Sequence, residues 1–271
     1  MNILSSYHRR RKSNVRFFVI FVAAAIIAVF WLSPGSEAAE KDFPFYPGEK
    51  LTFKLRWEFI PAGEATLEVL PMVTINGLKS YHFVMTAKTT PFIDHFYKVR
   101  DRVDAYADEK MTHSVFYKKN QHEGKTRRDV IVNFDWERME AQYLNFGKKR
   151  EPISILPGSF DPFSILYYVR LLEIKEESIF KRPVTDGKKC VMGIGTVIKR
   201  ETIKLKSGTY DTYLLEPELK HIGGVFEKSK HAKLKIWITA DQRRIPVKVK
   251  SKVVVGSFIA ELVSDVTVGG Q

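Results

Sequence analysis

Apolar and charged residues alternate along most of this chain, and that alternation limits its fold more than any other feature. In KLTFKLRWEF, residues 50–59, the apolar side chains at every second position are separated by polar or charged ones. A period of two predicts a strand with one apolar and one charged face. Further strands are expected near residues 64–70, 81–85, 97–106, 115–122, 126–134, 139–146, 188–199, 202–206, 210–216, 232–239, 246–255 and 258–264.

Turn signals separate these segments. Asn76-Gly77 is a strong hairpin signal because both residues tolerate positive φ. Pro61 to Gly63 also predicts a turn, between the first two strands. Gly223-Gly224, flanked by apolar residues, predicts either a plain hairpin connection or a mobile apolar loop that gates a cavity or touches a membrane.

One segment, SFDPFSILYYVRLLEI, lacks the alternation. Asp161 is placed to cap a helix and Pro162 to occupy its first position, so we expect one helix over residues 162–172. This helix is apolar on most sides, which predicts burial against a curved sheet.

Together these patterns predict a mainly β protein. The expected fold is a single large antiparallel, incompletely closed β-barrel, with one main α-helix packed against or into it. No Gly/Ser-rich linker interrupts residues 39–271, which are therefore expected to form one domain. The 19 Phe, 11 Tyr and 4 Trp either fill the interior or line a cavity for an apolar ligand.

The first residues predict export. A basic leader precedes an uncharged apolar run over residues 17–32, and small residues at Ser36 and Ala38 suit cleavage. Residues 1–38 are thus expected to be a signal peptide or, if uncleaved, an inner-membrane anchor. Both readings place the remainder in the periplasm.

Export changes the meaning of the charge. The whole chain has a net charge of +13; without the five basic leader residues and Glu37, 39 Lys and Arg stand against 30 Asp and Glu. Outside the cytoplasm this excess favours an anionic membrane surface over nucleic acid, or serves only solubility. Basic stripes such as Lys248, Lys250 and Lys252 fit an outer barrel face or a docking surface.

No catalytic or metal-binding pattern is present. The seven histidines form no HExxH motif, and Cys190 is the only cysteine, so neither a zinc site nor a dithiol is predicted. Cys190 fits a small buried residue better than a reactive thiol. Asp94, His95, Asp101 and Asp104 are the one group whose convergence would indicate a hydrolase. No cofactor is expected.

Three segments, residues 46–69, 160–170 and 235–263, resemble the exported bacterial family called domain of unknown function 3108. That resemblance implies a periplasmic or envelope-associated β domain with no established catalytic residues. The hairpin WITADQRRIPVKV is also similar, more distantly, to that of periplasmic lipoprotein carriers, which are open barrels around an apolar cavity. Those carriers have several helices, whereas this chain has one clear helix.

The expected function is non-enzymatic binding of a lipid, lipoprotein or lipopolysaccharide. An envelope scaffold acting through its outer surface is the alternative, and a hydrolase of glycans or lipids is a third reading. The sequence does not indicate an oligomeric state. Five residues are predicted to line a cavity: Phe53, Leu55, Trp57, Phe83 and Tyr167. Four are predicted to stand at its rim: Arg243, Arg244, Lys248 and Lys250.

Overall fold

The computed structural model describes residues 43–218, 233–253 and 256–267. The expected signal or anchor segment, residues 1–38, and the Gly223-Gly224 loop lie outside the described residues. Within these ranges no helix is both long and apolar enough to cross a lipid bilayer.

Fifteen strands of the described residues form one antiparallel sheet. Its neighbours run in the order β10-β11-β12-β13-β14-β15-β1-β2-β3-β4-β5-β6-β7-β8, and β9 pairs with β7. The strands are β1 (Glu49–Trp57), β2 (Ile60–Ile75), β3 (Leu78–Thr89), β4 (Arg100–Asp108), β5 (Ser114–Glu123), β6 (Thr126–Asp135), β7 (Glu140–Asn145), β8 (Lys148–Lys149), β9 (Ile153–Ser154), β10 (Ile179–Thr185), β11 (Cys190–Leu205), β12 (Gly208–Pro217), β13 (Lys233–Thr239), β14 (Pro246–Val253) and β15 (Gly256–Thr267).

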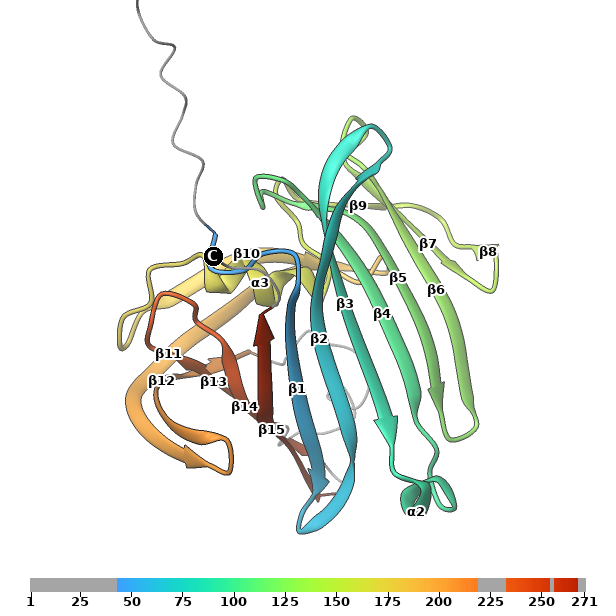
Figure 1. Ribbon diagram of the computed structural model, residues 1–271. Coiled ribbons are helices and arrows are strands. Elements are labelled where there is room, and N and C mark those ends of the chain that lie inside the picture. Colours follow the sequence, from blue (N-terminus) through green and yellow to red (C-terminus); the bar gives the residue numbers. More distant parts are fainter. Residues whose placement is uncertain (1–42, 219–232, 254–255, 268–271) are drawn as a thin grey trace, which may run out of the picture. The chain divides into compact units, whose positions relative to one another are not determined.

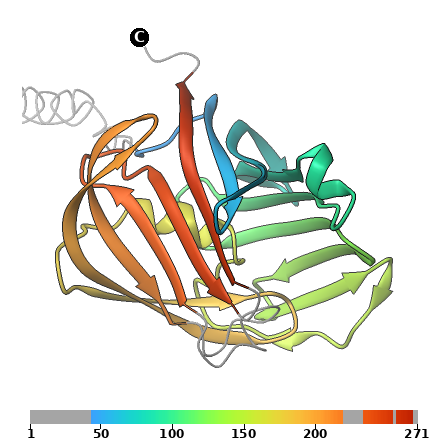
Figure 2. The ribbon, with the colours of Figure 1, turned by 90° about the horizontal axis from the view of Figure 1, so that it is seen from below.

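The predicted fold class is confirmed. The sheet curves into a barrel that stays open, because its end strands β10 and β8 do not pair with each other (Figure 1). Helix α3 (Ser164–Arg170) lies on the concave side of the sheet (Figure 2), and a short helix, α2 (Pro91–Asp94), follows β3.

Helix α3 begins later than expected, with Phe163 as its N-cap, and Asp161 holds the turn that precedes it. The carboxylate of Asp161 accepts hydrogen bonds from the backbone N–H groups of Phe163 and Ser164, both at 2.8 Å, and from the Ser114 hydroxyl at 2.6 Å. Asp161 is fully buried, and this burial raises its pKa. Residues 162–163 form a turn ahead of the helix, which is therefore shorter than the expected 162–172.

The expected turn at Pro61 to Gly63 is wrong. These residues belong to β2, and the chain reverses earlier, at Glu58, which has a φ of 50°. Gly63 allows β2 and β3 to approach closely, because a Cβ atom at this position would collide with the backbone carbonyl oxygen of Lys88 on β3.

Three strands were not expected: β8, β9 and β10. β10 contains Pro183, which argues against a central strand but is tolerated at a sheet edge, where β10 lies. Conversely, the two strands expected at residues 188–199 and 202–206 are one long strand, β11, with a register shift between Val197 and Lys199. A bulge keeps the strand continuous while bending it.

The described side chains form three apolar clusters in the interior. The largest lies between β2–β7 and one side of α3, and is rich in aromatic rings. A second cluster joins β1 to β12–β15, and a third lies beside the end of α3.

Candidate functional site: an apolar cavity

A cavity of about 590 Å³ opens inside the curved sheet, against the side of α3 that carries Leu166 and Val169. That volume lies within the range of ligand pockets, roughly 300–1,000 Å³. Its wall is almost entirely apolar. The lining comes from β1–β3 (Phe53, Ala65, Leu67, Met85), from the turn before α3 (Phe163), from α3 (Ile165, Leu166, Val169), from β10 and β11 (Phe180, Val184, Val191, Met192, Ile194) and from β12–β15 (Leu215, Leu234, Ile236, Ile238, Val249, Ala260).

Helix α3 divides the barrel interior into a filled part and a hollow part. Leu166 and Val169 face the cavity. Tyr167, between them, faces the other way and stacks on Phe83 at a centroid distance of 3.8 Å. The helix therefore seals a packed aromatic core on one side and offers an aliphatic wall on the other.

Charged groups are confined to one part of the lining: Arg182, Asp186, Lys189 and Glu218. The Arg182 guanidinium donates to the carbonyl of Thr112 at 2.6 Å and lies over the Tyr168 ring at 4.6 Å. Both contacts fix its position. An apolar chain in the cavity would thus end near two cations and two carboxylates.

The structure does not bring the five predicted lining residues together. Phe53 lines the cavity. Leu55 and Trp57 follow on the same strand, and Trp57 is 40% exposed at the barrel end. Phe83 and Tyr167 are fully buried in the packed aromatic cluster on the opposite side of α3.

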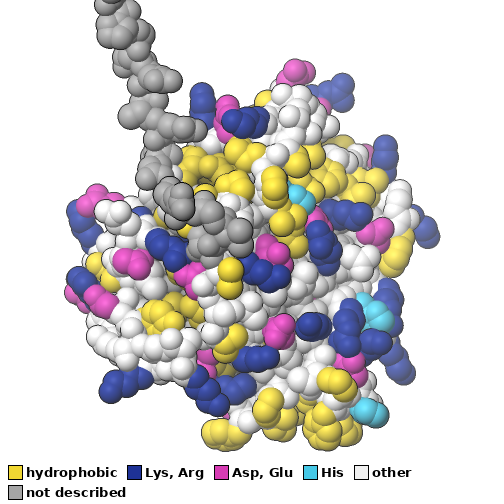
Figure 3. Space-filling view, viewed as in Figure 1, with side chains coloured by type: hydrophobic (Ala, Val, Ile, Leu, Met, Phe, Trp, Pro, Cys, Tyr) yellow, Lys and Arg dark blue, Asp and Glu magenta, His cyan; other side chains and the backbone are white. Residues whose placement is uncertain are grey.

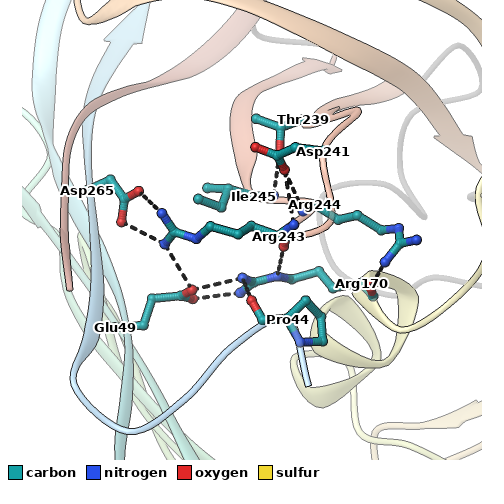
Figure 4. Close-up of polar contacts among 9 residues, drawn as sticks. All are labelled: Pro44, Glu49, Arg170, Thr239, Asp241, Arg243, Arg244, Ile245 and Asp265. Atoms are coloured by element: carbon teal, nitrogen blue, oxygen red, sulfur yellow. Dashed lines mark hydrogen bonds and ion pairs between the residues drawn. The ribbon is translucent and has the colours of Figure 1, made fainter. Parts of the chain in front are cut away.

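Arg243 and Arg244, predicted at the rim, hold α3 in place (Figure 4). Arg170, at the end of α3, makes a bidentate ion pair with Glu49, with N–O distances of 2.6 and 2.8 Å, and both side chains are 1% exposed. Arg243 reaches Glu49 at 3.5 Å, and its backbone carbonyl accepts from Arg170 at 3.1 Å. Neither Arg243 nor Arg244 lines the cavity.

The turn before these arginines is built by Asp241. Its carboxylate accepts from the Thr239 hydroxyl and from the backbone N–H groups of Arg243 and Arg244. The two arginine side chains point elsewhere: Arg243 pairs with Asp265 at 2.6 Å, and Arg244 donates to the carbonyl of Arg170 at 3.1 Å. The β13–β14 turn is therefore joined to the end of α3 through Arg243 and Arg244.

The two predicted rim lysines belong to the outer face. Lys248 pairs with Glu261 on β15 at 3.1 Å, and Lys250 is exposed on the same strand. Other lysines of the basic stripes also pair across strands, as Lys54 does with Glu64 at 2.9 Å and Lys235 with Glu216 at 3.0 Å. Much of the stripes' charge is thus neutralised locally.

The group proposed for a hydrolase does not converge. Asp94 pairs with Arg100, and Asp104 with His82 and Arg102. His95 bonds the carbonyl of Pro91, and Asp101 accepts from the backbone N–H of His122. None of the four lines the cavity. Among the described residues, no cluster of three or more His, Cys, Asp or Glu side chains could hold a metal ion.

Asp101 is expected to make stability depend on pH. Burial, together with the neighbouring Glu123 carboxyl, raises the pKa of Asp101 to about 6. Between about pH 4 and 6 the folded chain then binds more protons than the unfolded chain, so the unfolding free energy falls as pH rises. Because Asp101 is partly exposed, we expect a loss of about 1 kcal/mol.

The measurement is urea unfolding of the wild type and of Asp101→Asn across that pH range. The stability of the wild type minus that of the variant should fall through the interval and level off above it. A difference that stays flat, or that rises with pH, would contradict the raised pKa.

Comparison with known proteins agrees with this architecture. The family described as "Protein of unknown function (DUF3108)" matches residues 52–263. No curated protein matches the chain. The chain is similar to the solved β-barrel-like protein of domain of unknown function DUF1849 from Brucella abortus, with a TM-score of 0.53, 8% identity, and coverage of 82% of this chain and 98% of that one. At this identity the likeness shows the barrel-like fold alone.

Two further solved structures are similar at lower TM-scores. A protein from Bacteroides fragilis, described as exported and YmcC-like in fold, has a TM-score of 0.37 and 8% identity, covering 83% of this chain and 98% of its own. A protein described as a lipoprotein, from Parabacteroides distasonis, has a TM-score of 0.34 and 11% identity, covering 83% of this chain and 97% of its own.

Proposed function

Since the chain belongs to the DUF3108 family, whose description assigns no activity, we propose its function from the cavity: it is an exported envelope protein that binds the apolar part of an amphiphilic envelope component. The membership expected from three sequence segments is confirmed, while the more distant likeness to lipoprotein carriers stays a prediction. The ligand class is a lipid, or the lipid part of a lipoprotein or lipopolysaccharide. The periplasm is the proposed compartment.

One observation carries the proposal: a cavity of about 590 Å³ whose wall is apolar on every contributing element. Apolar surface facing water is unfavourable, so an apolar ligand gains free energy by entering. The charged side chains are grouped rather than scattered, which suits a molecule with one polar end and one apolar end.

The direct test is native mass spectrometry of the protein purified from its own host, followed by extraction and identification of bound lipid. A mass increment that extraction assigns to an acyl-chain lipid is the expected result. Protein that carries no lipid, and takes up none when offered a mixed lipid extract of its host, would overturn the proposal.

Filling the cavity should abolish retention of the ligand. Ala65 on β2 and Ala260 on β15 both line the cavity, so Ala65→Phe and Ala260→Phe project rings into the space the ligand would occupy. We expect at least about tenfold less lipid per folded protein, since a loss of about 1.4 kcal/mol suffices for that factor. Lipid is quantified by mass spectrometry after extraction, relative to protein that is monomeric and folded by circular dichroism.

Val132→Ala is the matched control for this prediction. Val132 is 1% exposed in the large aromatic cluster and does not line the cavity, so its truncation perturbs the core and leaves every lining side chain in place. Lipid loss in Val132→Ala equal to that in the two filled variants would point to general destabilisation instead of occlusion.

An envelope scaffold remains the alternative, and one observation favours it. β10 pairs along its length with β11 alone among the described strands, apart from a bridge at Val184, and Ile179 at its start is 62% exposed. Such an edge can accept a strand from a partner. Recovery of a stoichiometric protein partner, with no lipid in the extract, would favour this reading over ligand binding.

A further inference from the structure

One end of the barrel exposes a group of large apolar side chains, which we call the aromatic tip. Phe59 is 91% exposed, Phe96 76% and Phe92 65%. Soluble surfaces seldom gather such side chains without a partner. The aromatic tip consists of Trp57, Phe59, Ile60, Phe92, Phe96, Tyr97 and Phe258.

The sheet topology brings these residues together although they are far apart in sequence. Phe59 and Ile60 lie where β1 turns into β2, and Trp57 is paired with Ile60 on one side and Phe258 on the other. Phe92, Phe96 and Tyr97 lie in the connection from β3 to β4, next to the start of β2, since Thr90 N–H donates to Ala62. Hydrophobic side chains gather at this lower end in Figure 3.

The connection that carries three of these rings is held in a defined conformation. Thr90 caps α2, and Asp94 accepts from Arg100 at 2.5 and 3.1 Å and also from Thr89. Phe92 and Phe96 pack edge to face at 5.6 Å. Exposure of these rings is therefore part of the folded structure and does not reflect a frayed segment.

Cations without ion-pair partners surround the aromatic tip. Lys98, Lys125 and Lys252 are exposed, and Arg127 donates only to backbone carbonyls. None of these four lies within 4.0 Å of a carboxylate of the described residues, unlike the stripe lysines Lys54 and Lys248. Of the carboxylates nearby, Asp94 pairs with Arg100 and Glu64 with Lys54 and Lys88, whereas Glu58 makes no ion pair with a described residue and accepts from the backbone N–H of Ser257.

We propose that this end of the barrel docks on an anionic phospholipid bilayer, with the aromatic tip at the level of the headgroups and the four cations on lipid phosphates. Aromatic side chains favour that interfacial depth, and basic residues gain from the negative surface potential. Protruding rings with unpaired cations around them match the two contributions that hold a protein at an anionic bilayer, apolar insertion and attraction to lipid phosphates.

Docking this end would bring Trp57 and Phe258, which lie on the cavity-facing side of β1 and β15, to the bilayer. Ala260 lines the cavity, and Phe258 lies two residues nearer the barrel end on the same face of β15. Leu55 and Trp57 are their partners on β1. The docking proposal itself does not require a ligand in the cavity, so it and the proposed function can fail separately.

A site-specific fluorescent probe tests the docking. Cys190 is the only cysteine, so Cys190→Ser gives a background in which single cysteines at Phe59→Cys and Phe92→Cys can carry an environment-sensitive dye. Leu78→Cys is the control, because Leu78 is also an exposed apolar residue but lies at the opposite end of β2, across the hairpin. Each variant is produced in the native host, so that it undergoes the same processing as the wild type.

Vesicles of phosphatidylcholine with phosphatidylglycerol should shift the emission of both tip probes to the blue, and leave the Leu78 probe unchanged. Pure phosphatidylcholine, or high salt, should reduce the shift, because screening weakens surface attraction. Tip probes that do not respond, or an equal response at Leu78, would overturn the proposal. Capture of the tip by a protein in the absence of vesicle binding would also overturn it.

The cations give a graded second readout. In the Phe59→Cys background, Lys98→Gln and Lys125→Gln should each raise the lipid concentration at half-maximal shift about fivefold. Lys110→Gln, an exposed lysine in the β4–β5 turn at the other end, should leave it unchanged. Equal effects of all three substitutions would show that net charge, and not this surface, controls binding.

Discussion

Arg170→Ala is expected to lower the free energy of unfolding by about 3–5 kcal/mol, the usual cost of removing one partner of a buried ion pair. Glu49 and Arg170 are each 1% exposed and are joined by two hydrogen bonds. Without the guanidinium, the Glu49 carboxylate keeps, among the described residues, only the contact with Arg243 at 3.5 Å, and the carbonyl of Pro44 loses its donor. α3 would then lose its link to β1, and the hydrogen bond from Arg244 to the backbone carbonyl of residue 170 would remain as its link to the β13–β14 turn.

Urea unfolding followed by circular dichroism measures this loss. The matched control is Arg200→Ala, because Arg200 also makes a bidentate pair, with Asp211, but both side chains are about half exposed. Its cost should be about 0–1 kcal/mol. Similar losses in the two variants would show that the buried network does not anchor α3.

Phe83→Ala is expected to cost about 3–5 kcal/mol and to leave ligand retention intact. Phe83 is 0% exposed and stacks on Tyr167 at 3.8 Å, so its removal leaves a void in the packed cluster. Neither Phe83 nor Tyr167 lines the cavity, although Phe163 belongs to both the packed cluster and the cavity wall. Phe83→Ala should therefore lower the free energy of unfolding without lowering the lipid content.

The comparison uses lipid per folded protein, below the unfolding transition. Leu166→Ala is the matched variant on the cavity side of α3; it should cost less, because Leu166 is only partly buried, and should change the lipid content. Lipid loss in Phe83→Ala with none in Leu166→Ala would place the ligand on the other side of the helix.

The strands could be read from the sequence because their signal is local. Alternation within ten residues predicts β1 without knowledge of its neighbours, and Asn76-Gly77 forms the expected hairpin turn with positive φ at both residues. β10 was missed because Pro183 removes a ladder donor, which matters only in a central strand. Edge position is a property of the assembled sheet.

The sequence could suggest that the barrel encloses an apolar cavity, but it could not show which residues line that cavity. In the sequence, an inward-facing Phe that lines an empty cavity cannot be told from one that packs against another ring. The position of α3 makes the difference: Phe53 lines the cavity, whereas Phe83 packs in the aromatic cluster. Arg243 reads as an exposed turn residue because its partner Glu49 lies 194 positions away. One signal was available: Arg170 in the apolar run of α3 implies a buried counter-ion.

The pairing of β1 with β15 sets the order in which the domain can fold. Glu49 pairs with Thr267, so β1, the first strand to be synthesised, has both edges paired only after β15, the last described strand, has been made. Until then β1 presents an unsatisfied edge beside β2, and loop closure over more than 200 residues opposes completion. A chain released before residue 256 would lack β15 and keep that edge. Slow, non-local folding of this kind favours aggregation, and makes protection of the nascent chain by a chaperone valuable.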